Sequence, residues 1–291
     1  MENSLRKENV RMQIKLGVIL RCFARSDDQI TKQVEEVSQA IGMIGSLFPS
    51  AYFSLLRMDV VIPTDPRFID VDCGQTHAAF ESQSRSMRWQ TVCVSTRKLD
   101  LFSGLVNEAA ARQLSFGCTH SLVFSSTCVD LISNANVEAM TRPFSDGAKA
   151  TGLILPDPTL GEFIRRGCIT NTFAIWDLVA FFAVGGLDLA LRNRYKDDRF
   201  NTYVRGAKDE AIPITGLEIP TVARLIDSYG PCVAPVVPVT AGEWKKPNDE
   251  EGRRREDAKM RSKATRHLAI AALYGFDLSF IEAGILPGYP K

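Results

Sequence analysis

The residues of this chain that could carry chemistry fall in four short stretches in a fixed order. They are Phe102–Ala111, Ser121–Met140, Thr170–Asp188 and Gly216–Gly230. In the second stretch, an apolar strand sequence leads into Thr127, Val129 and Asp130. Mn²⁺ and Mg²⁺ need several hard oxygen ligands, which a threonine, a valine and one aspartate do not supply. The sequence therefore predicts no metal site here, and either ion would bind only if other ligands supplemented Asp130.

Other common catalytic and binding patterns do not occur in the sequence. The three histidines, at positions 77, 120 and 267, do not pair with cysteine or glutamate at metal-ligand spacing, which argues against a zinc site. The seven cysteines form no CxxC pair, and most sit in apolar runs. We therefore expect free buried thiols in a reducing compartment, the cytoplasm. No P-loop, GxGxxG or GxSxG sequence is present.

The bulk composition is that of a soluble globular protein. The 291 residues suffice for one large α/β domain or two small ones. The net charge of +1 gives no bias toward nucleic acid, so we expect no nucleic-acid partner. Met1–Gln13 lacks the apolar core of a signal peptide. The longest apolar run, Ala174–Leu191, is interrupted by two aspartates and a Gly-Gly pair, so we predict no transmembrane segment and leave peripheral membrane association open.

The elements that position the four stretches begin with a strand, a helix and a strand. Leu16–Ala24 is short, apolar and β-branched, which predicts a buried strand. Gln29–Leu47 has apolar residues at three- and four-residue steps and follows a good N-cap sequence, Ser26–Asp28, which predicts a helix. Tyr52–Ile62 returns as a strand. Short turns between these elements favour a parallel sheet.

The alternation continues beyond an irregular stretch at Pro63–Ser86. Further elements are expected at Trp89–Ser95, Ser121–Ser125 and Ala150–Leu155 (strands) and at Gly104–Leu114 and Asn134–Arg142 (helices). This repeated pattern predicts an α/β fold with a doubly wound, mostly parallel sheet.

The second part of the chain is more mixed. Its expected elements are an edge strand at Thr170–Ile175, a helix at Asp177–Val184, a polar loop at Arg192–Ala211, a helix at Pro220–Tyr229 and a strand at Cys232–Val239. Trp244–Arg266 carries charges of both signs and is expected to open a C-terminal helix with a solvated face, with docking onto an acidic partner or a phosphate surface as the alternative. We divide the chain into a polar tail (1–13), a domain (14–243) and a charged helical extension (244–291).

Taken in order, the four stretches resemble the nucleotide-sugar glycosyltransferases of the GT-A fold, especially the inverting family 2. Gly104 and Asn107 match a glycine and an asparagine that open a helix before the metal strand of that family. Gly185, Gly186 and Asp188 resemble its acceptor-side loop. The resemblance covers residues 14–240 and implies a GT-A sheet, the nucleotide-diphospho-sugar transferase type.

The resemblance also implies a catalytic role for Glu218. In the family, a carboxylate at the start of this helix is the general base that deprotonates the acceptor hydroxyl and permits single-displacement inversion. Glu218 matches the second of two acidic positions, whereas Leu217 replaces the first; Arg224 and Gly230 match the arginine and glycine that follow. A glutamate favoured by the helix dipole is the alternative interpretation.

On the donor side, the resemblance implies a nucleotide-sugar pocket without the usual metal ion. Thr127 and Val129 occupy the two metal-aspartate positions, and Asp130 matches the acidic residue that follows. The pocket would be lined by Arg25, Asp65, Asn107, Thr127 and Asp130, with Arg25, Arg199, Arg205 and Lys208 as candidate cations for the diphosphate. A Pro-Thr-Asp-Pro turn explains Asp65 equally well. We expect Thr127–Asp130 to end a central strand and to face one cleft with Glu218.

Three functions are consistent with this interpretation. The first is a hexosyltransferase-like enzyme that transfers a sugar from a nucleotide-diphosphate-sugar to a hydroxyl of a glycan, lipid or protein acceptor. The second is a non-catalytic binding or scaffolding protein of the same fold, which the residues at 127, 129 and 217 favour. The third, a nucleotide-sugar pyrophosphorylase, would need a glycine-rich loop after the first strand, and Arg21–Gln29 contains no glycine.

Overall fold

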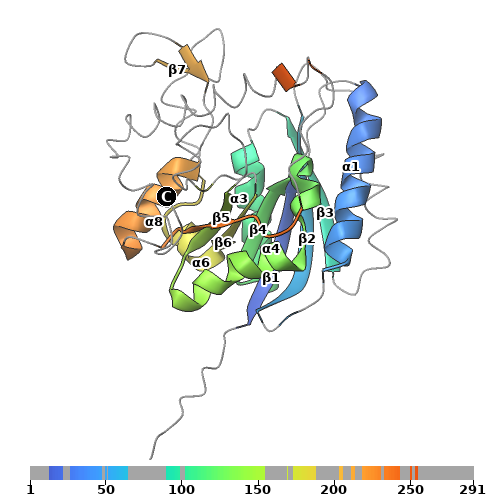
Figure 1. The fold of residues 1–291 in the computed structure, drawn as a ribbon. Helices are drawn as coiled ribbons and strands as arrows, with labels where there is room; N and C mark the ends of the chain where they lie inside the picture. The colour runs from blue at the N-terminus through green and yellow to red at the C-terminus, as the bar shows by residue number, and fades with distance from the viewer. Residues whose placement is uncertain are drawn as a thin grey trace, which may run out of the picture.

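Seven strands form one mixed sheet in the computed structural model of this chain, in the order β3-β2-β1-β4-β6-β5-β9 (Figure 1). The strands are β1 (Ile14–Arg21), β2 (Phe53–Thr64), β3 (Gln90–Lys98), β4 (His120–Ser125), β5 (Ala150–Ile154), β6 (Phe173–Asp177) and β9 (Val236–Pro238). The structure describes residues 13–21, 27–47, 50, 52–64, 90–98, 102–154, 169, 173–187, 203–205, 211–213, 218–230, 233–242, 250 and 253–254. Among these strands, β6 alone runs antiparallel to its neighbours.

The alternation of side chains along β1 shows why this sheet is covered on both faces. Leu16, Val18 and Leu20 enter one hydrophobic cluster, whereas Ile19 enters the other. Successive side chains of a strand point to opposite faces, so the two clusters lie on opposite sides of the sheet. A strand that is apolar on both faces reads as a continuous hydrophobic run, which is the pattern of the sequence here.

Helices cover each face. On the first face lie α1 (Asp27–Gly45), the 3₁₀ helices η2 (Ser126–Leu131) and η3 (Arg142–Asp146), and α4 (Asn134–Thr141); on the second lie α3 (Phe102–Phe116), α6 (Leu178–Ala183) and α8 (Glu218–Tyr229). Ile41 of α1 packs in the first cluster and Leu105 of α3 in the second. The predicted α/β fold with a doubly wound, mostly parallel sheet is therefore confirmed (Figure 1).

Two expectations about the second half of the chain need correction. The strand expected at the sheet edge, β6, lies in the interior between β4 and β5, and Phe173–Trp176 are buried. The stretch expected to be a polar loop, Arg192–Ala211, contains one short strand, β7 (Tyr203–Arg205), and its last residue begins a second, β8 (Ala211–Pro213). These strands pair antiparallel as a separate two-stranded sheet.

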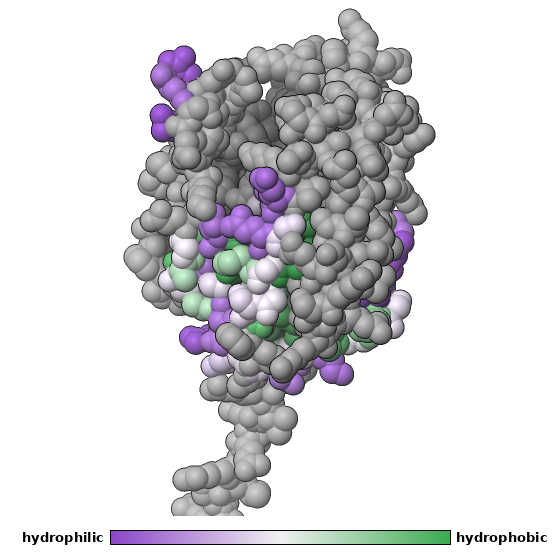
Figure 2. All heavy atoms as spheres, turned by 90° about the vertical axis from the view of Figure 1, so that its right-hand side faces the viewer, coloured by the Kyte–Doolittle hydropathy of each residue, from purple (hydrophilic) through white to green (hydrophobic). Residues whose placement is uncertain are grey.

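The surface and the C-terminal segment are described in part. On the α1 side, Figure 2 shows hydrophilic and hydrophobic residues intermixed over the described surface. Within the expected C-terminal extension, residues 250, 253 and 254 are described and helical, and Arg254 Nη2 donates to Glu250 Oε1 across 2.6 Å. Of the predicted tail, residues 1–13, only residue 13 is among the described residues. No helix in the described part of the chain has the length and apolar character needed to cross a membrane.

The orientation of α8 determines where Glu218 lies. Lys149 Nζ lies 5.4 Å from the centroid of the Tyr229 ring and 3.3 Å from Asp177 Oδ2. Asp177 is the strand partner of His120, the first residue of β4. Tyr229, the last residue of α8, is therefore at the amino-end edge of the parallel strands. The twelve residues of α8 span about 18 Å at 1.5 Å per residue, which carries Glu218 toward the carboxyl-end edge.

Candidate functional site

Three of the four stretches singled out in the sequence meet around Gly186. Asn107 of α3 donates from Nδ2 to the Leu187 carbonyl at 3.0 Å and accepts from the Leu187 N–H at 2.9 Å through Oδ1. The Gly186 carbonyl accepts from Thr221 Oγ1 at 2.8 Å and from Arg224 Nη2 at 3.1 Å, both in α8. The turn after α6 is thus held between α3 and α8, and Asn107, Gly186 and the helix of Glu218 lie together.

The local sequence explains the form of this turn. The Asp177 carboxylate accepts from the N–H groups of Val179 and Ala180 and so caps the start of α6. At the other end, the Gly185 N–H donates to the Phe182 carbonyl and the Gly186 N–H to the Phe181 carbonyl, which is a Schellman ending.

Both glycines of the turn are required by its geometry. Gly185 has φ +88° and Gly186 has φ +66°, a region that favours glycine. A Cβ on Gly186 would also come within 3.0 Å of Asn107 Oδ1. The Gly-Gly pair therefore ends α6 and lets the Asn107 side chain approach the backbone, while Asp188 lies outside the described residues.

Glu218 is the first residue of α8 and is 6% exposed. It lies one turn before Thr221, whose hydroxyl holds Gly186. A carboxylate in the first turn of a helix is stabilised by the dipole and by the N–H groups of that turn. Glu218 is therefore a buried residue toward the carboxyl-end side of the sheet, at the start of the helix that, together with α3, holds the Gly186 turn.

The part of the second stretch that follows β4 lies on the other face of the sheet. Cys128 and Val129 of η2 are buried in the cluster that contains α1, whereas Val222 and Leu225 of α8 are buried in the opposite cluster. We expected Thr127–Asp130 to end a strand and to share a cleft with Glu218. Instead, this segment is a 3₁₀ helix that follows β4, and it packs with α1 rather than with α8. The expected shared cleft is not confirmed by this packing.

Asn136, in the second stretch, is a buried polar residue that was not among the predicted site residues. It is fully buried, its Nδ2 donates to the carbonyls of Leu131 and Ala241, and its Oδ1 accepts from the N–H and hydroxyl of Thr240. The segment after β9 is thereby fixed against η2. A signal was present in the sequence, because Ser133 caps α4 and places Asn136 in its first turn.

The close approach of the same segment to η2 explains Gly242. Its φ is +82°, and a Cβ there would lie 2.2 Å from the carbonyl oxygen of Asp130. No side chain larger than hydrogen fits without moving one of the two backbones. Asp130, which the resemblance placed in the donor pocket, is itself partly buried.

Several predicted site residues are outside the described part of the chain. These are Arg25, Asp65, Asp188, Arg199 and Lys208. Arg205 is described only as the last residue of β7, and Thr127 only as part of η2. The roles assigned to these seven residues stay predictions.

Within the described residues, no group of three or more histidine, cysteine, aspartate or glutamate side chains could hold a metal ion. Cys118 and Cys128 are buried free thiols. Burial raises the pKa of the Cys118 thiol to about 11, so it is protonated at neutral pH and a poor nucleophile.

Comparisons with known proteins leave the family open. No family model and no curated protein matches this chain. Among solved structures, a 4-diphosphocytidyl-2C-methyl-D-erythritol synthase from Anaerococcus prevotii has a TM-score of 0.44 and 9% identity, with 87% of this chain and 97% of that chain covered. A cytidylyltransferase from Leptospira borgpetersenii has a TM-score of 0.44 and 10% identity, over 93% and 98% of the two chains.

A third solved structure is a mannosyltransferase from Pyrobaculum calidifontis in complex with GDP-Man and Mn²⁺. Its TM-score is 0.40 with 13% identity, and 92% of this chain and 77% of that chain are covered. Because these TM-scores and identities are low, none of the three likenesses assigns a family or an activity to this chain.

Proposed function

We propose that this protein is a transferase that uses a nucleotide-diphosphate-sugar donor and passes the sugar to a hydroxyl acceptor by inverting single displacement. Glu218 would act as the general base that accepts the proton of the acceptor hydroxyl. The unit responsible would be residues 14–243, a GT-A-like domain in the cytoplasm, with residues 1–13 as a tail and 244–291 as an extension.

One observation carries this proposal. The stretches around Asn107, Gly186 and Glu218, which carry the resemblance to the glycosyltransferases, are far apart in the sequence yet are joined by hydrogen bonds around Gly186. Ligands of open α/β sheets bind beside the carboxyl ends of the strands, and Glu218 begins α8 toward that edge. The geometry supports a base held beside a rigid acceptor-side turn.

The proposed mechanism does not depend on a metal ion. In the glycosyltransferases that the sequence resembles, two aspartates hold the metal ion that neutralises the departing diphosphate. Here Val129 is buried in the core instead. We propose that Arg25, Arg205 and Lys208 supply the positive charge, because guanidinium and ammonium groups bind phosphate oxygens strongly.

A donor screen tests the proposal. Melting temperatures of the full chain would be measured with UDP-, GDP-, CDP- and dTDP-sugars, each with and without Mn²⁺. A donor at a hundredfold excess over its Kd stabilises the folded state by about 2.7 kcal/mol. We expect one donor to stabilise the protein without Mn²⁺, and release of its nucleoside diphosphate on addition of an acceptor. If no donor shifts the melting temperature at millimolar concentration, the proposal fails.

The burial of Cys128 and Val129 favours a second candidate function, a non-catalytic protein that keeps the fold to bind a nucleotide-sugar or to act as a scaffold. The same screen separates the two candidates. A binding protein would be stabilised by a donor but would release no nucleoside diphosphate with any acceptor, and Glu218→Gln would leave its behaviour unchanged.

A further inference from the structure

A second site is indicated at the other end of the molecule, beneath the last turns of α3. A surface cavity that is widely open to solvent, with a volume of about 450 Å³, is lined there by Arg57, Glu108, Ala111, Arg112, Ser115 and Phe116. Arg57 pairs in the sheet with Gly17 and with Gln90, the first residue of β3, and Gly17 pairs with Ser121, near the start of β4. The cavity is therefore near the amino ends of β3 and β4, away from the edge toward which Glu218 lies.

Arg57 forms a buried, fixed wall of this cavity. Its Nε lies 3.0 Å from Asp59 Oδ2 and its Nη2 lies 3.0 Å from Asp59 Oδ1, so one edge of the guanidinium is bound to the carboxylate. The side chain of Arg57 is only 10% exposed. In the part of the chain that the structure describes, its Nη1 makes no hydrogen bond, and that nitrogen is left to donate to a ligand.

The Asp59 carboxylate is also hydrogen-bonded to Gln113, and this second contact helps to fix the orientation of Arg57. Gln113 is fully buried and donates from Nε2 to Asp59 Oδ2 and to the Val18 carbonyl, each at 2.9 Å. The absence of a side chain at Gly17 makes room for this amide, because a Cβ there would lie 2.2 Å from Gln113 Oε1. Arg57 is therefore connected through Asp59 and Gln113 to the backbone of β1.

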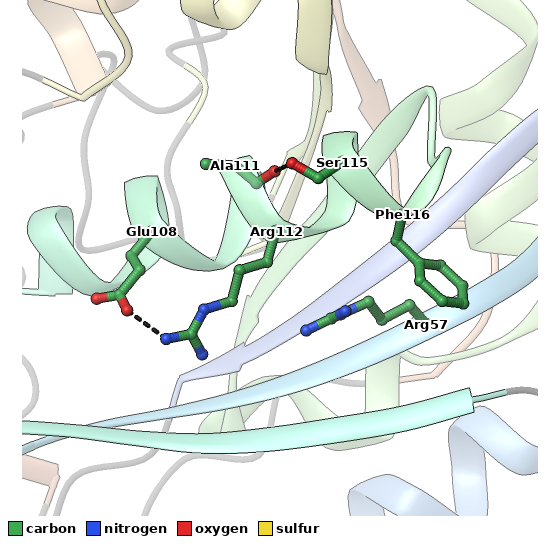
Figure 3. Close-up of a pocket in the computed structure, with 6 residues that line it drawn as sticks. All are labelled: Arg57, Glu108, Ala111, Arg112, Ser115 and Phe116. Carbon is green, nitrogen blue, oxygen red and sulfur yellow. Dashed lines mark hydrogen bonds and ion pairs between the residues drawn. The ribbon is translucent and has the colours of Figure 1, made fainter.

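Arg112 brings a second guanidinium to the same cavity. Figure 3 shows the guanidinium groups of Arg112 and Arg57 on the side of α3 that faces the sheet, with the Phe116 ring beside Arg57. Arg112 is paired with Glu108 one turn earlier, and the two side chains are 36% and 24% exposed. Such a pair contributes little, so a ligand anion can replace Glu108 as the partner of Arg112. Among the described residues, Nε and Nη1 of Arg112 have no hydrogen-bond acceptor.

Phe116 adds an apolar surface to the two cations. Its ring is centred 5.6 Å from the guanidinium carbon of Arg57, and the residue is 41% exposed although it is large and hydrophobic. A buried ion pair such as Arg57–Asp59 is weak evidence for stability, because its desolvation cost rivals its attraction. A buried guanidinium, a partly exposed guanidinium and an exposed aromatic ring around one cavity instead have the composition of a ligand site.

We propose that this cavity binds a small organic carboxylate, with its carboxylate between Arg57 and Arg112 and its apolar part against Phe116. Planar guanidinium groups match carboxylates through paired N–H···O bonds. Asp59 and Glu108 balance the two arginines formally, which favours a monoanion over a dianion. This site is separate from the nucleotide-sugar site proposed above.

Benzoate serves as the probe. Benzamide has the same shape without the negative charge, and acetate has the negative charge without the aromatic ring. Binding to the full chain would be followed by ligand-observed NMR titration. We expect benzoate to bind saturably and more tightly than benzamide, acetate or inorganic phosphate. Arg112→Gln should weaken benzoate binding by about tenfold or more, because a hydrogen bond to a charged group is lost.

The control variant is Arg254→Gln, because Arg254 pairs with Glu250 in the same i,i+4 arrangement elsewhere on the surface. It should bind benzoate like the wild type, and Phe116→Ala should weaken benzoate but not acetate. Arg112 and Phe116 are partly exposed, so both variants should retain the wild-type melting temperature. Equal binding of benzamide and benzoate, unchanged binding in Arg112→Gln, tighter binding of phosphate, or no saturable binding of benzoate at tens of millimolar would each overturn the proposal.

Discussion

Asn107 and Leu187, eighty positions apart in the sequence, are joined by two hydrogen bonds between one side-chain amide and the backbone of one residue. This contact fixes the turn after α6 against α3. Because the Gly186 carbonyl in the same turn also accepts from Thr221 and Arg224, the turn is fixed on its other side by α8. One short segment of backbone therefore links α3, α6 and α8, which also pack together in one hydrophobic cluster.

Replacing Asn107 should loosen this segment. In Asn107→Ala, the N–H and carbonyl of Leu187 lose their partner while Leu187 itself stays buried. We expect the free energy of unfolding to fall by about 1–3 kcal/mol, the cost of leaving buried polar groups unpaired. Urea unfolding measures this change, with Gln39→Ala on the exposed face of α1 as the control. A loss no larger than that of Gln39→Ala would show that the contact contributes nothing.

The contact of Gly17 with Gln113 gives a second prediction. A Cβ at position 17 would overlap Gln113 Oε1 at 2.2 Å, and Gln113 cannot move without releasing Asp59 and the Val18 carbonyl. Gly17→Ala should therefore destabilise the fold by about 1–3 kcal/mol, as overpacking of a core does. In a Gln113→Ala background the same substitution should cost much less, because the overlapping group is gone. Equal costs in both backgrounds would refute the steric explanation.

His120 predicts a dependence of stability on pH. It is buried beside Phe144, bonded to Thr119 Oγ1 and near Asp177 and Lys149. Burial lowers the pKa of His120 from 6.5 to about 4, against a smaller opposite effect of Asp177.

Between these two pH values, the unfolded chain binds a proton that the folded chain does not, so stability falls as the pH falls. The contribution lost is about 3 kcal/mol between pH 6.5 and pH 4. Unfolding free energies of the wild type and of His120→Asn should therefore converge as the solution becomes acidic. A difference that stays constant over this range would mean that His120 does not titrate in this way.

The sequence predicted the elements of this fold well because their signals are local. The apolar periodicity of residues 29–47 and the short β-branched runs before and after it correspond to α1, β1 and β2 within a few residues. Strand direction is not local. Phe173–Asp177 was expected at an edge, yet it is inserted antiparallel between β4 and β5, because pairing partners on both sides decide its place.

The candidate site was predictable only in part, for the same reason. Asn107, Gly186 and Glu218 were singled out from motif order, but their connection runs through Leu187, Thr221 and Arg224 and has no sequence signature. Thr127–Asp130 were expected to end a central strand and to face one cleft with Glu218. They lie instead in a 3₁₀ helix, in which Cys128 and Val129 are buried in the cluster that contains α1. Polar core residues such as Gln113 and Asn136 acquire their roles from partners about a hundred positions away.

The last prediction concerns Glu218 and rests on the proposed transferase function. Glu218→Gln keeps the shape of a side chain that is 6% exposed but removes the group that accepts a proton. If Glu218 is the base, the rate of sugar transfer should fall by about 10²–10⁴-fold, while the affinity for the donor measured by thermal shift stays close to that of the wild type. Glu35→Gln on the exposed side of α1 is the matched control and should transfer at the wild-type rate. Transfer at full rate by Glu218→Gln would remove Glu218 from the chemistry. A loss of donor affinity together with rate would instead assign Glu218 to binding, because a general base contributes only once the acceptor hydroxyl begins to lose its proton.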